Sequence, residues 1–259
     1  MAGLALADGG VQSANTVGYQ EITLYPGWNM VSINFANVGS NEGMTLDEIF
    51  PGTTQGLTAY RTAMSADYVK VWDGATQTYP NTYFLYVSRQ VNDPEKDYTW
   101  RVSASAAATQ KFKSGTAFWF YKQGDASVSL KVAGEVEYSA TTSPTIEIHH
   151  GYNMINAPFA SALDLNRLGA AYWKTSGATA YRTAMSADYV KVWNGDSQTY
   201  PSTYYLYVSR QENDAEKDYT WRESASTSAP NDIVGMGKGV WYYHQGEGFT
   251  LTLPFPYSL

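Results

Sequence analysis

Tyr60–Ser105 reads YRTAMSADYVKVWDGATQTYPNTYFLYVSRQVNDPEKDYTWRVSAS, and Tyr181–Ser226 reads YRTAMSADYVKVWNGDSQTYPSTYYLYVSRQENDAEKDYTWRESAS. The two stretches differ at eight of 46 positions and keep a constant offset of 121 residues. Weaker matches flank them in the same order on both sides: Gly27–Phe35 with Gly151–Phe159, and Phe118–Gly124 with Val240–Gly246. Because the order is preserved, the chain is a tandem duplication of one whole unit.

The duplication divides the chain into two domains of ordinary size. We expect repeat domain 1 at residues 17–138 and repeat domain 2 at residues 145–259, joined by the small polar linker 139–144. We expect residues 1–16 to form an N-terminal tail. Within it, Ala5–Ala7 has the A-x-A pattern of the end of a signal peptide, and an ordinary apolar tail is the alternative.

The composition excludes several classes of protein. Of the 259 residues, 44% are hydrophobic and 16% are charged, so the chain can build cores and is not disordered. The net charge of −7 argues against nucleic-acid partners, because no cationic excess offsets repulsion by phosphates. No apolar run approaches the roughly 20 residues of a membrane-spanning helix. The absence of cysteine excludes disulfides and thiolate metal sites.

Hydrophobic alternation predicts an all-β fold. Ser127–Val132 and Phe249–Leu253 alternate strictly between apolar and polar residues, which is the period of a half-buried strand. One helix is expected, because Thr45–Glu48 forms a capping box and Pro51-Gly52 ends the segment. With turns every 8–12 residues, each repeat is predicted to be a β-sandwich or barrel-like domain with at most one short helix.

Two turn dipeptides predict hairpins at matching places in the repeats. Asp73-Gly74 and Asn194-Gly195 follow apolar strands, and both dipeptides favour positive φ and hence a type I′ turn. Pro80 and Pro201 come early in the strand that follows each turn. Because proline lacks an N–H donor, we expect them at an edge, a bulge or the start of a strand.

The sequence has few residues of the types that usually bind metals or catalyse reactions. The adjacent His149 and His150 point to opposite faces of a strand and cannot readily share an ion, and His244 has no counterpart in repeat one. The loops with Asp93/Asp97 and Asp214/Asp218 offer carboxylates to Ca²⁺, with a solvated turn as the favoured alternative. No nucleophile or phosphate-binding motif occurs. We therefore expect no catalytic residue, no metal site and no cofactor.

Aromatic residues carry the remaining signal, because tryptophan and tyrosine suit both sugar stacking and protein interfaces. The alternative is that they fill the two cores. The strand Tyr83–Val87 is apolar on both faces, so one face is expected to meet the other repeat, another chain or a ligand. For a glycan site the candidate pairs are Trp72/Trp193 and Trp100/Trp221, and Asp67 and Asp188 lie near the first pair in the sequence. The candidates for an interface or for ligand stacking are Trp72, Tyr83, Tyr86, Trp100, Trp193, Tyr204, Tyr207 and Trp221.

Three motifs carry a resemblance to a family. They are the start at Ala14–Tyr19, the sequence Gly27-Trp-Asn-Met30, and Gly115-Thr-Ala-Phe-Trp119. The chain resembles uncharacterised exported β-rich tandem-repeat proteins of planctomycete- and verrucomicrobia-like bacteria. The resemblance spans nearly the whole chain and implies a secreted or cell-surface protein with a β fold. It implies no active site, because the shared motifs are packing and turn residues.

Two functions follow as hypotheses. The first is a structural subunit of an extracellular filament, sheath or surface layer whose partner is a second copy of the chain. If the repeats touch through unlike faces, the same contact between chains builds an open polymer, and an extended terminus can add a strand to a neighbouring sheet. The alternative is a carbohydrate-binding or adhesive module with two equivalent aromatic sites, whose partner is a glycan.

Overall fold

The computed structural model describes residues 16–38, 43–89, 91, 93–212, 214–231 and 233–257. The predicted signal-peptide remnant at residues 1–7 and the first two residues of the Ala14–Tyr19 motif lie outside these ranges. The elements of the first half are β1 (Val17–Leu24), β2 (Gly27–Ser32), α1 (Leu46–Ile49), the 3-10 turn η1 (Ala63–Ser65), β3 (Tyr68–Lys70), β4 (Thr82–Tyr86), β5 (Thr99–Ser103), β6 (Ala106–Ala107), β7 (Ala117–Lys122) and β8 (Val128–Glu135). Those of the second half are β9 (Thr145–Ile148), β10 (Gly151–Ile155), the 3-10 turn η2 (Asn166–Leu168), α2 (Gly169–Thr175), β11 (Tyr189–Asn194), β12 (Thr199–Tyr207), β13 (Thr220–Arg222), β14 (Val240–His244) and β15 (Phe249–Thr252).

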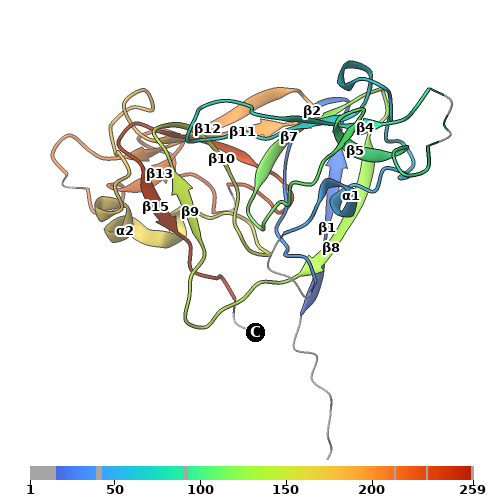
Figure 1. Ribbon diagram of the computed structural model, residues 1–259. Coiled ribbons are helices and arrows are strands. Elements are labelled where there is room, and N and C mark those ends of the chain that lie inside the picture. Colours follow the sequence, from blue (N-terminus) through green and yellow to red (C-terminus); the bar gives the residue numbers. More distant parts are fainter. Residues whose placement is uncertain are drawn as a thin grey trace, which may run out of the picture.

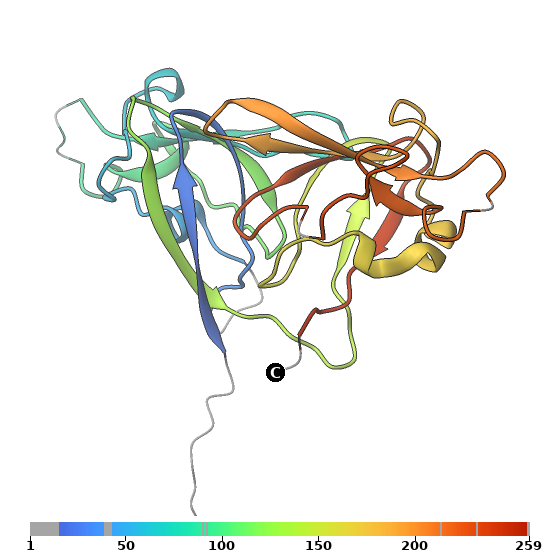
Figure 2. The ribbon, with the colours of Figure 1, turned by 180° about the vertical axis from the view of Figure 1, so that it is seen from behind.

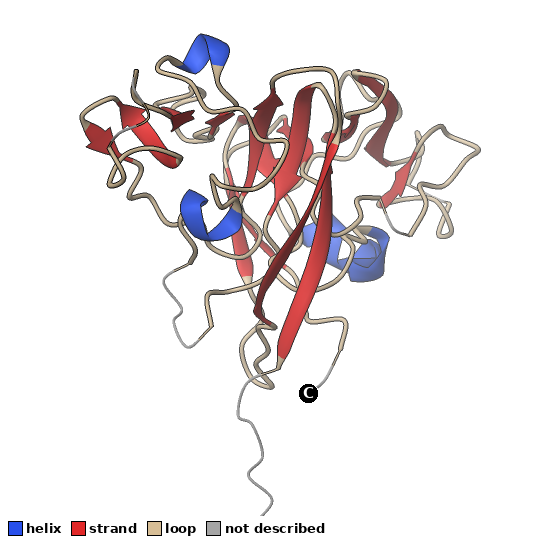
Figure 3. Cartoon of the chain, turned by 90° about the vertical axis from the view of Figure 1, so that its right-hand side faces the viewer, coloured by secondary structure: helices blue, strands red, loops and turns tan. Residues whose placement is uncertain are grey.

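The all-β prediction is confirmed, since strands and loops make up nearly all of the described chain and the helices are short pieces (Figure 3). The predicted capping box is present in α1, where the Thr45 side chain accepts from the Glu48 backbone N–H and the Glu48 carboxylate accepts from the Thr45 N–H. Helix α2 was not predicted. No helix in the described ranges is both long and apolar enough to cross a membrane.

Each half is a two-layer sandwich of antiparallel strands. In the first half the large sheet has the order β2-β7-β3-β4-β5-β6, and the ribbon β1-β8 faces it. In the second half the large sheet has the order β10-β14-β11-β12-β13, and the ribbon β15-β9 faces it. The two large sheets form one layer along the top of the molecule, and the ribbons β1-β8 and β15-β9 lie below it (Figures 1 and 2).

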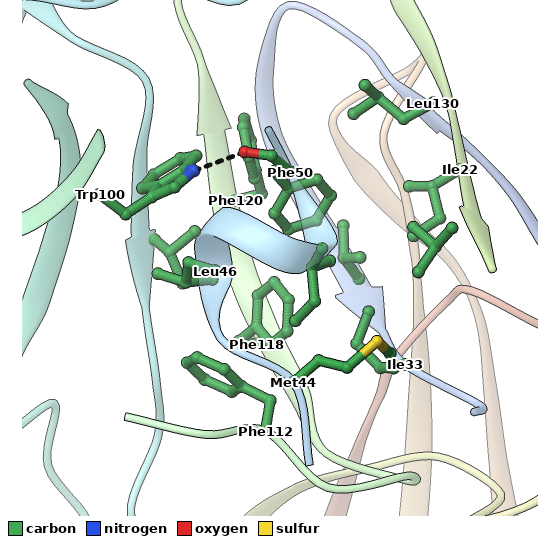
Figure 4. Packing of buried hydrophobic residues seen from close by; sticks show 14 of the residues in the cluster. Ile22, Ile33, Met44, Leu46, Phe50, Trp100, Phe112, Phe118, Phe120 and Leu130 are labelled. Carbon is green, nitrogen blue, oxygen red and sulfur yellow. Dashed lines mark hydrogen bonds between the residues drawn. The ribbon is translucent and has the colours of Figure 1, made fainter. Parts of the chain in front are cut away.

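Each half has its own hydrophobic core between the large sheet and the ribbon. The first core draws residues from Ile22 to Val132 and the second from Ile148 to Leu253, on either side of the segment 139–144. In the first core, α1 lies over the sheet, and the Trp100 indole Nε1 donates to the Phe50 carbonyl at 2.8 Å (Figure 4).

In the second core η2 and α2, which follow each other directly, lie at the place of α1. Trp173 of α2 is fully buried, and its ring lies 5.3 Å from that of Trp221, the repeat equivalent of Trp100. In the first core the Phe50 ring contacts the Trp100 ring at 6.2 Å. Asp47 of α1 and Asn166 of η2 each accept from the backbone N–H of the tryptophan in their own repeat, so equivalent helical segments cover it in both cores.

Both predicted hairpins are present, but the predicted type I′ turn is wrong. Neither Gly74 nor Gly195 has positive φ, and the left-handed residues are instead Gln77 at 55° and Gln198 at 53°. In repeat one Asp73 pairs with Thr78, which leaves a four-residue loop. The placement of Pro201 is as expected, because it lies in β12 where the register with β11 shifts.

The two repeats contact each other through equivalent faces. A backbone bridge joins Val31 to Lys238, and a second bridge joins Thr116 to Ile155. Because Ile155 is the repeat equivalent of Val31 and Thr116 that of Lys238, the two bridges are related by an approximate two-fold axis. Contacts of this isologous kind close on themselves. The condition under which the contact between repeats would build an open polymer, contact through unlike faces, is therefore not met.

The reciprocal contacts continue at the hairpin loops. The Gln198 side chain bonds both backbone groups of Trp28, accepting from its N–H and donating to its carbonyl at 2.8 Å each. The Gln77 side chain likewise accepts from the Tyr152 N–H at 2.8 Å and donates to the Tyr152 carbonyl at 2.9 Å. The loop glycines are required by this close approach, since a Cβ on Gly195 would lie 2.7 Å from Asn29 Oδ1. Each hairpin loop is thus docked on the opposite repeat.

Candidate ligand-binding groove

Four of the eight candidate aromatic residues are core residues. Trp100 and Trp221 have no exposed surface, and Tyr83 and Tyr204 are 2% and 8% exposed. All four point from the large sheets into the two cores. With no free ring face they cannot stack on a ligand, and that expectation is wrong for them.

Tyr86 and Tyr207 lie on the opposite face of the large sheets and are half-buried. The guanidinium of Arg101 lies 5.8 Å from the Tyr86 ring centre, and that of Arg222 lies 6.0 Å from the Tyr207 ring centre. Both tyrosines therefore already have a cation as partner.

Trp72 and Trp193 are the candidates that the structure brings to the axis. The Trp193 indole Nε1 donates to the Trp28 carbonyl at 2.8 Å, and its ring packs edge-on against Trp119 at 5.3 Å. The Trp72 indole Nε1 makes the equivalent bond to the second repeat, donating to the Tyr152 carbonyl at 2.7 Å, and its ring packs edge-on against Trp241 at 5.3 Å. Each tryptophan reaches out of its own repeat and lies on the other.

The strand β7 shows why this face is aromatic. Phe118 and Phe120 point into the core, so the alternation of the strand places Trp119 and Tyr121 on the outer face. In β14, Trp241 and Tyr243 occupy the equivalent positions. The outer face of both sheets next to the axis is consequently built from large rings.

These rings enclose a groove that crosses the axis, which we call the aromatic groove. Its two halves have volumes of about 250 and 300 Å³ and share Tyr79 and Tyr200. The first half is lined by Trp28, Lys70, Tyr79, Trp119, Trp193 and Tyr200. The second half is lined by their repeat equivalents Tyr152, Lys191, Tyr200, Trp241, Trp72 and Tyr79.

The tyrosine hydroxyls of the groove are oriented by tryptophan. Trp119 Nε1 donates to the Tyr79 hydroxyl at 3.1 Å, and Trp241 Nε1 donates to the Tyr200 hydroxyl at 3.0 Å. An indole N–H can only donate, so each hydroxyl accepts this bond and keeps its own proton for another partner. Burial raises the pKa of both tyrosines above the usual value, so the proton stays in place.

Each half of the groove also holds a lysine. The Lys70 ammonium lies 5.8 Å from the ring centre of Tyr79 and 5.9 Å from that of Trp28. The Lys191 ammonium lies 5.3 Å from the ring centre of Tyr189. These are cation–π distances. Within the described residues, neither ammonium forms an ion pair with a carboxylate.

The aromatic surface extends outward from the groove in both directions. Tyr68 and Tyr121 are stacked with ring centres 4.9 Å apart, and Tyr189 and Tyr243 repeat this arrangement at the same distance. On the second side a hollow of about 470 Å³ continues past Tyr152 over these rings. The result is a row of rings across both repeats.

Asp67 and Asp188 were expected beside the aromatic candidates but lie in the cores. Both are fully buried, and Asp67 accepts from the backbone N–H groups of Thr58 and Gln123 at 2.9 and 2.6 Å. Burial raises the pKa of Asp67. Asp188 additionally accepts from the Tyr242 hydroxyl at 2.9 Å and lies 2.8 Å from His244 Nδ1. Neither carboxylate lines the groove.

The aspartates of the two acidic loops are bonded to residues of the same loops. Asp97 accepts from the backbone and hydroxyl of Ser88 and from the Asp93 N–H, while Lys96 pairs with Asp93 at 2.6 Å. The second loop is held in the same way, with Lys217 on Asp214 at 2.7 Å. Asn92 and Asn213 of these loops lie outside the described residues. Across the described part of the chain, no group of three metal-ligating side chains converges.

The candidates predicted from the sequence include neither of the groove's lysines and only two of its eight rings, Trp72 and Trp193. A signal was present for Trp119 and Trp241, which match between repeats and alternate with the core-facing Phe118 and Phe120. No comparable signal exists for Lys70, which lies on an apolar strand and is brought to the rings only by tertiary packing. Comparison of the chain with known proteins finds no matching family model, no similar curated protein and no similar solved structure.

Proposed function

We propose that the protein binds a glycan chain in the aromatic groove. The observation that carries the proposal is the pair of matched groove halves, lined by tryptophan and tyrosine, that meet at Tyr79 and Tyr200. Tryptophan and tyrosine combine a broad apolar face with a polar tip, which matches the apolar C–H faces and the hydroxyls of a sugar ring. Tyr79, Tyr200 and Tyr152 are 38%, 40% and 37% exposed, so their rings are accessible.

The duplication supports a polymeric rather than a small ligand. Two equivalent half-sites on one rigid body bind two segments of the same chain with a high effective concentration for the second contact. The stacked pairs Tyr68–Tyr121 and Tyr189–Tyr243 continue the aromatic surface on each side. A long glycan therefore has several rings to stack on.

The proposed role is binding without catalysis. Hydrolysis of a glycosidic bond usually requires two carboxyl groups flanking the bond. The residues that line the two groove halves include neither a carboxylate nor a histidine. A module that binds extracellular glycans fits a secreted or cell-surface protein, and we propose that location.

The self-assembling role has less support. One route to a polymer required contacts between unlike faces of the repeats, whereas the contact between Val31 and Lys238 and its equivalent is reciprocal and closed within one chain. A polymer would need another surface, such as a strand edge. We therefore place glycan binding first and make assembly an outcome of the same experiment.

The test compares two pairs of tyrosines of equal exposure. Tyr79→Ala with Tyr200→Ala removes the shared centre of the groove, whereas Tyr60→Ala with Tyr181→Ala removes two tyrosines that are each 41% exposed and do not line it. Binding is measured on a panel of immobilised neutral and acidic polysaccharides, and the oligomeric state by size-exclusion chromatography.

We expect the groove variant to bind at least about tenfold more weakly, since two lost ring contacts are each worth about 1 kcal/mol. The control variant is expected to bind like the wild type. The proposal is overturned if the wild type retains none of the panel, or if both variants lose affinity equally. Polymers in the wild-type eluate together with no retention would favour the assembling role.

A further inference from the structure

The polar side-chain groups of the aromatic groove are lysine ammonium groups, indole N–H groups and tyrosine hydroxyls. Each half contributes one lysine ammonium, and each of Tyr79 and Tyr200 keeps a hydroxyl proton because its oxygen accepts from a tryptophan. The groove lining has no carboxylate and no side-chain amide. A neutral sugar hydroxyl both donates and accepts hydrogen bonds, and the groove lining offers it no carboxylate or amide oxygen as an acceptor.

The groove also differs in charge from the rest of the protein. The chain has a net charge of −7, yet the central groove holds two ammonium groups and no anion. Lys70 is positioned by the rings of Trp28, Tyr68 and Tyr79 at 5.8–5.9 Å rather than by a carboxylate. Ring faces hold a cation without neutralising it, so its charge remains available to a ligand.

We infer that the ligand of the aromatic groove is an acidic polysaccharide whose carboxylate or sulfate groups pair with Lys70 and Lys191. The inference rests on the proposed glycan-binding function and names its substrate class. The sugar rings stack on tryptophan and tyrosine, and an acidic group on the chain accepts from one ammonium in each half. Charge-assisted bonds of this kind are stronger than neutral ones, and the surrounding rings limit their screening by water. A polymer with a charge on successive sugars can supply both acidic groups from one chain.

The test uses ligands matched in everything but charge. An oligogalacturonate of six residues is compared with the same oligosaccharide after its carboxylates are reduced to alcohols, and dextran sulfate is compared with dextran. The first pair tests the carboxylate source and the second pair the sulfate source. Affinities are measured by titration calorimetry at low and at physiological salt. Poly-glutamate serves as an acidic chain without sugar rings.

Two lysine variants accompany these ligands. Lys70→Gln with Lys191→Gln removes the groove cations, while Lys131→Gln with Lys174→Gln removes equal charge elsewhere. The control lysines also lie over tyrosine rings, at 6.0 and 5.3 Å, but outside the groove. We expect the groove variant to bind at least one acidic ligand about tenfold more weakly and to lose the preference over its neutral partner. Salt is expected to weaken acidic binding in the wild type and much less in the groove variant.

The outcomes separate the two proposals. If no glycan of either charge binds, the proposed function fails. If neutral and acidic partners bind equally and Tyr79→Ala with Tyr200→Ala abolishes both, glycan binding stands and the acidic specificity is refuted. The same refutation follows if the control lysine variant loses as much affinity as the groove variant. Poly-glutamate bound as tightly as oligogalacturonate would replace the glycan by an acidic peptide.

Discussion

The junction between the repeats depends on Gln198 and its equivalent Gln77, and replacing Gln198 by alanine tests it. The amide of Gln198 accepts from the Trp28 N–H, donates to the Trp28 carbonyl, and donates to the Gly195 carbonyl at 2.5 Å. Alanine removes all three bonds at a partly buried site. At about 0.5–1.5 kcal/mol net per bond, less the side-chain entropy regained, we expect a loss of about 2–3 kcal/mol in the free energy of unfolding.

For a chain of this size the loss corresponds to a fall in Tm of about 4–12 °C, measured by thermal and urea unfolding. Gln77→Ala should cost the same, because Gln77 makes the three equivalent bonds to Tyr152 and Gly74. The control is Gln123→Ala, which removes one exposed bond to the Met64 carbonyl and should cost under about 1 kcal/mol. A Gln198→Ala variant as stable as the control, or a large difference between the two junction variants, would refute the reciprocal junction.

Three further predictions concern positions where the repeats differ or contact each other. Both ring nitrogens of His244 face acceptor oxygens. Burial alone would lower the pKa of His244, but the hydrogen bond and the charge of Asp188 raise it above 6.5. We therefore expect the Tm of the wild type to fall as pH rises through that raised pKa, and the Tm of His244→Lys to stay constant over the same range. Trp100→Phe should cost about 1 kcal/mol more than Trp221→Phe in urea unfolding, because only Trp100 donates an indole bond and the Trp221 Nε1 has no partner; equal costs would contradict this. Gly195→Ala should destabilise the chain by about 1–3 kcal/mol by overpacking the junction, and an unchanged Tm would show that the loop is not docked.

Much of the fold follows from local sequence. Strict alternation in Phe249–Leu253 corresponds to strand β15, and the reciprocal Thr45–Glu48 bonds correspond to the start of α1. Helix α2 was not predicted because it continues directly from η2 without a side-chain cap of its own, and because Trp173 is its only buried residue, so no periodic apolar face marks it. Local signals predict an element where a short-range contact creates it and fail where a distant one does.

The hairpin loops illustrate the same limit. Asp73-Gly74 is typical of a type I′ turn, but Gly74 is needed because a Cβ there would lie 2.8 Å from Asn153 Oδ1 of the other repeat. Glycine is needed at position 74 because of the close contact with Asn153, which lies 79 positions later in the sequence, and not because of a positive φ. A single sequence does not separate these two causes.

The candidate site was predictable only in its residue types. Aromatic residues were expected to meet a partner, yet Trp100 faces the core while Trp193 faces the axis, although both lie in nearly identical repeats. What decides between them is the face of the strand and the relation between the two repeats. The sequence duplication establishes two copies but carries no information on whether they meet through like or unlike faces.

The most direct test of the account maps a glycan onto individual tryptophans. In protein labelled with ¹⁵N at tryptophan, eight indole signals report on the whole chain. On titration with oligogalacturonate, we expect the five indoles of the groove to shift and the three buried in the cores to stay unchanged. The groove set is Trp28, Trp72, Trp119, Trp193 and Trp241, and the core set is Trp100, Trp173 and Trp221. Shifts confined to the core set, or no shift with any glycan of either charge, would contradict this expectation.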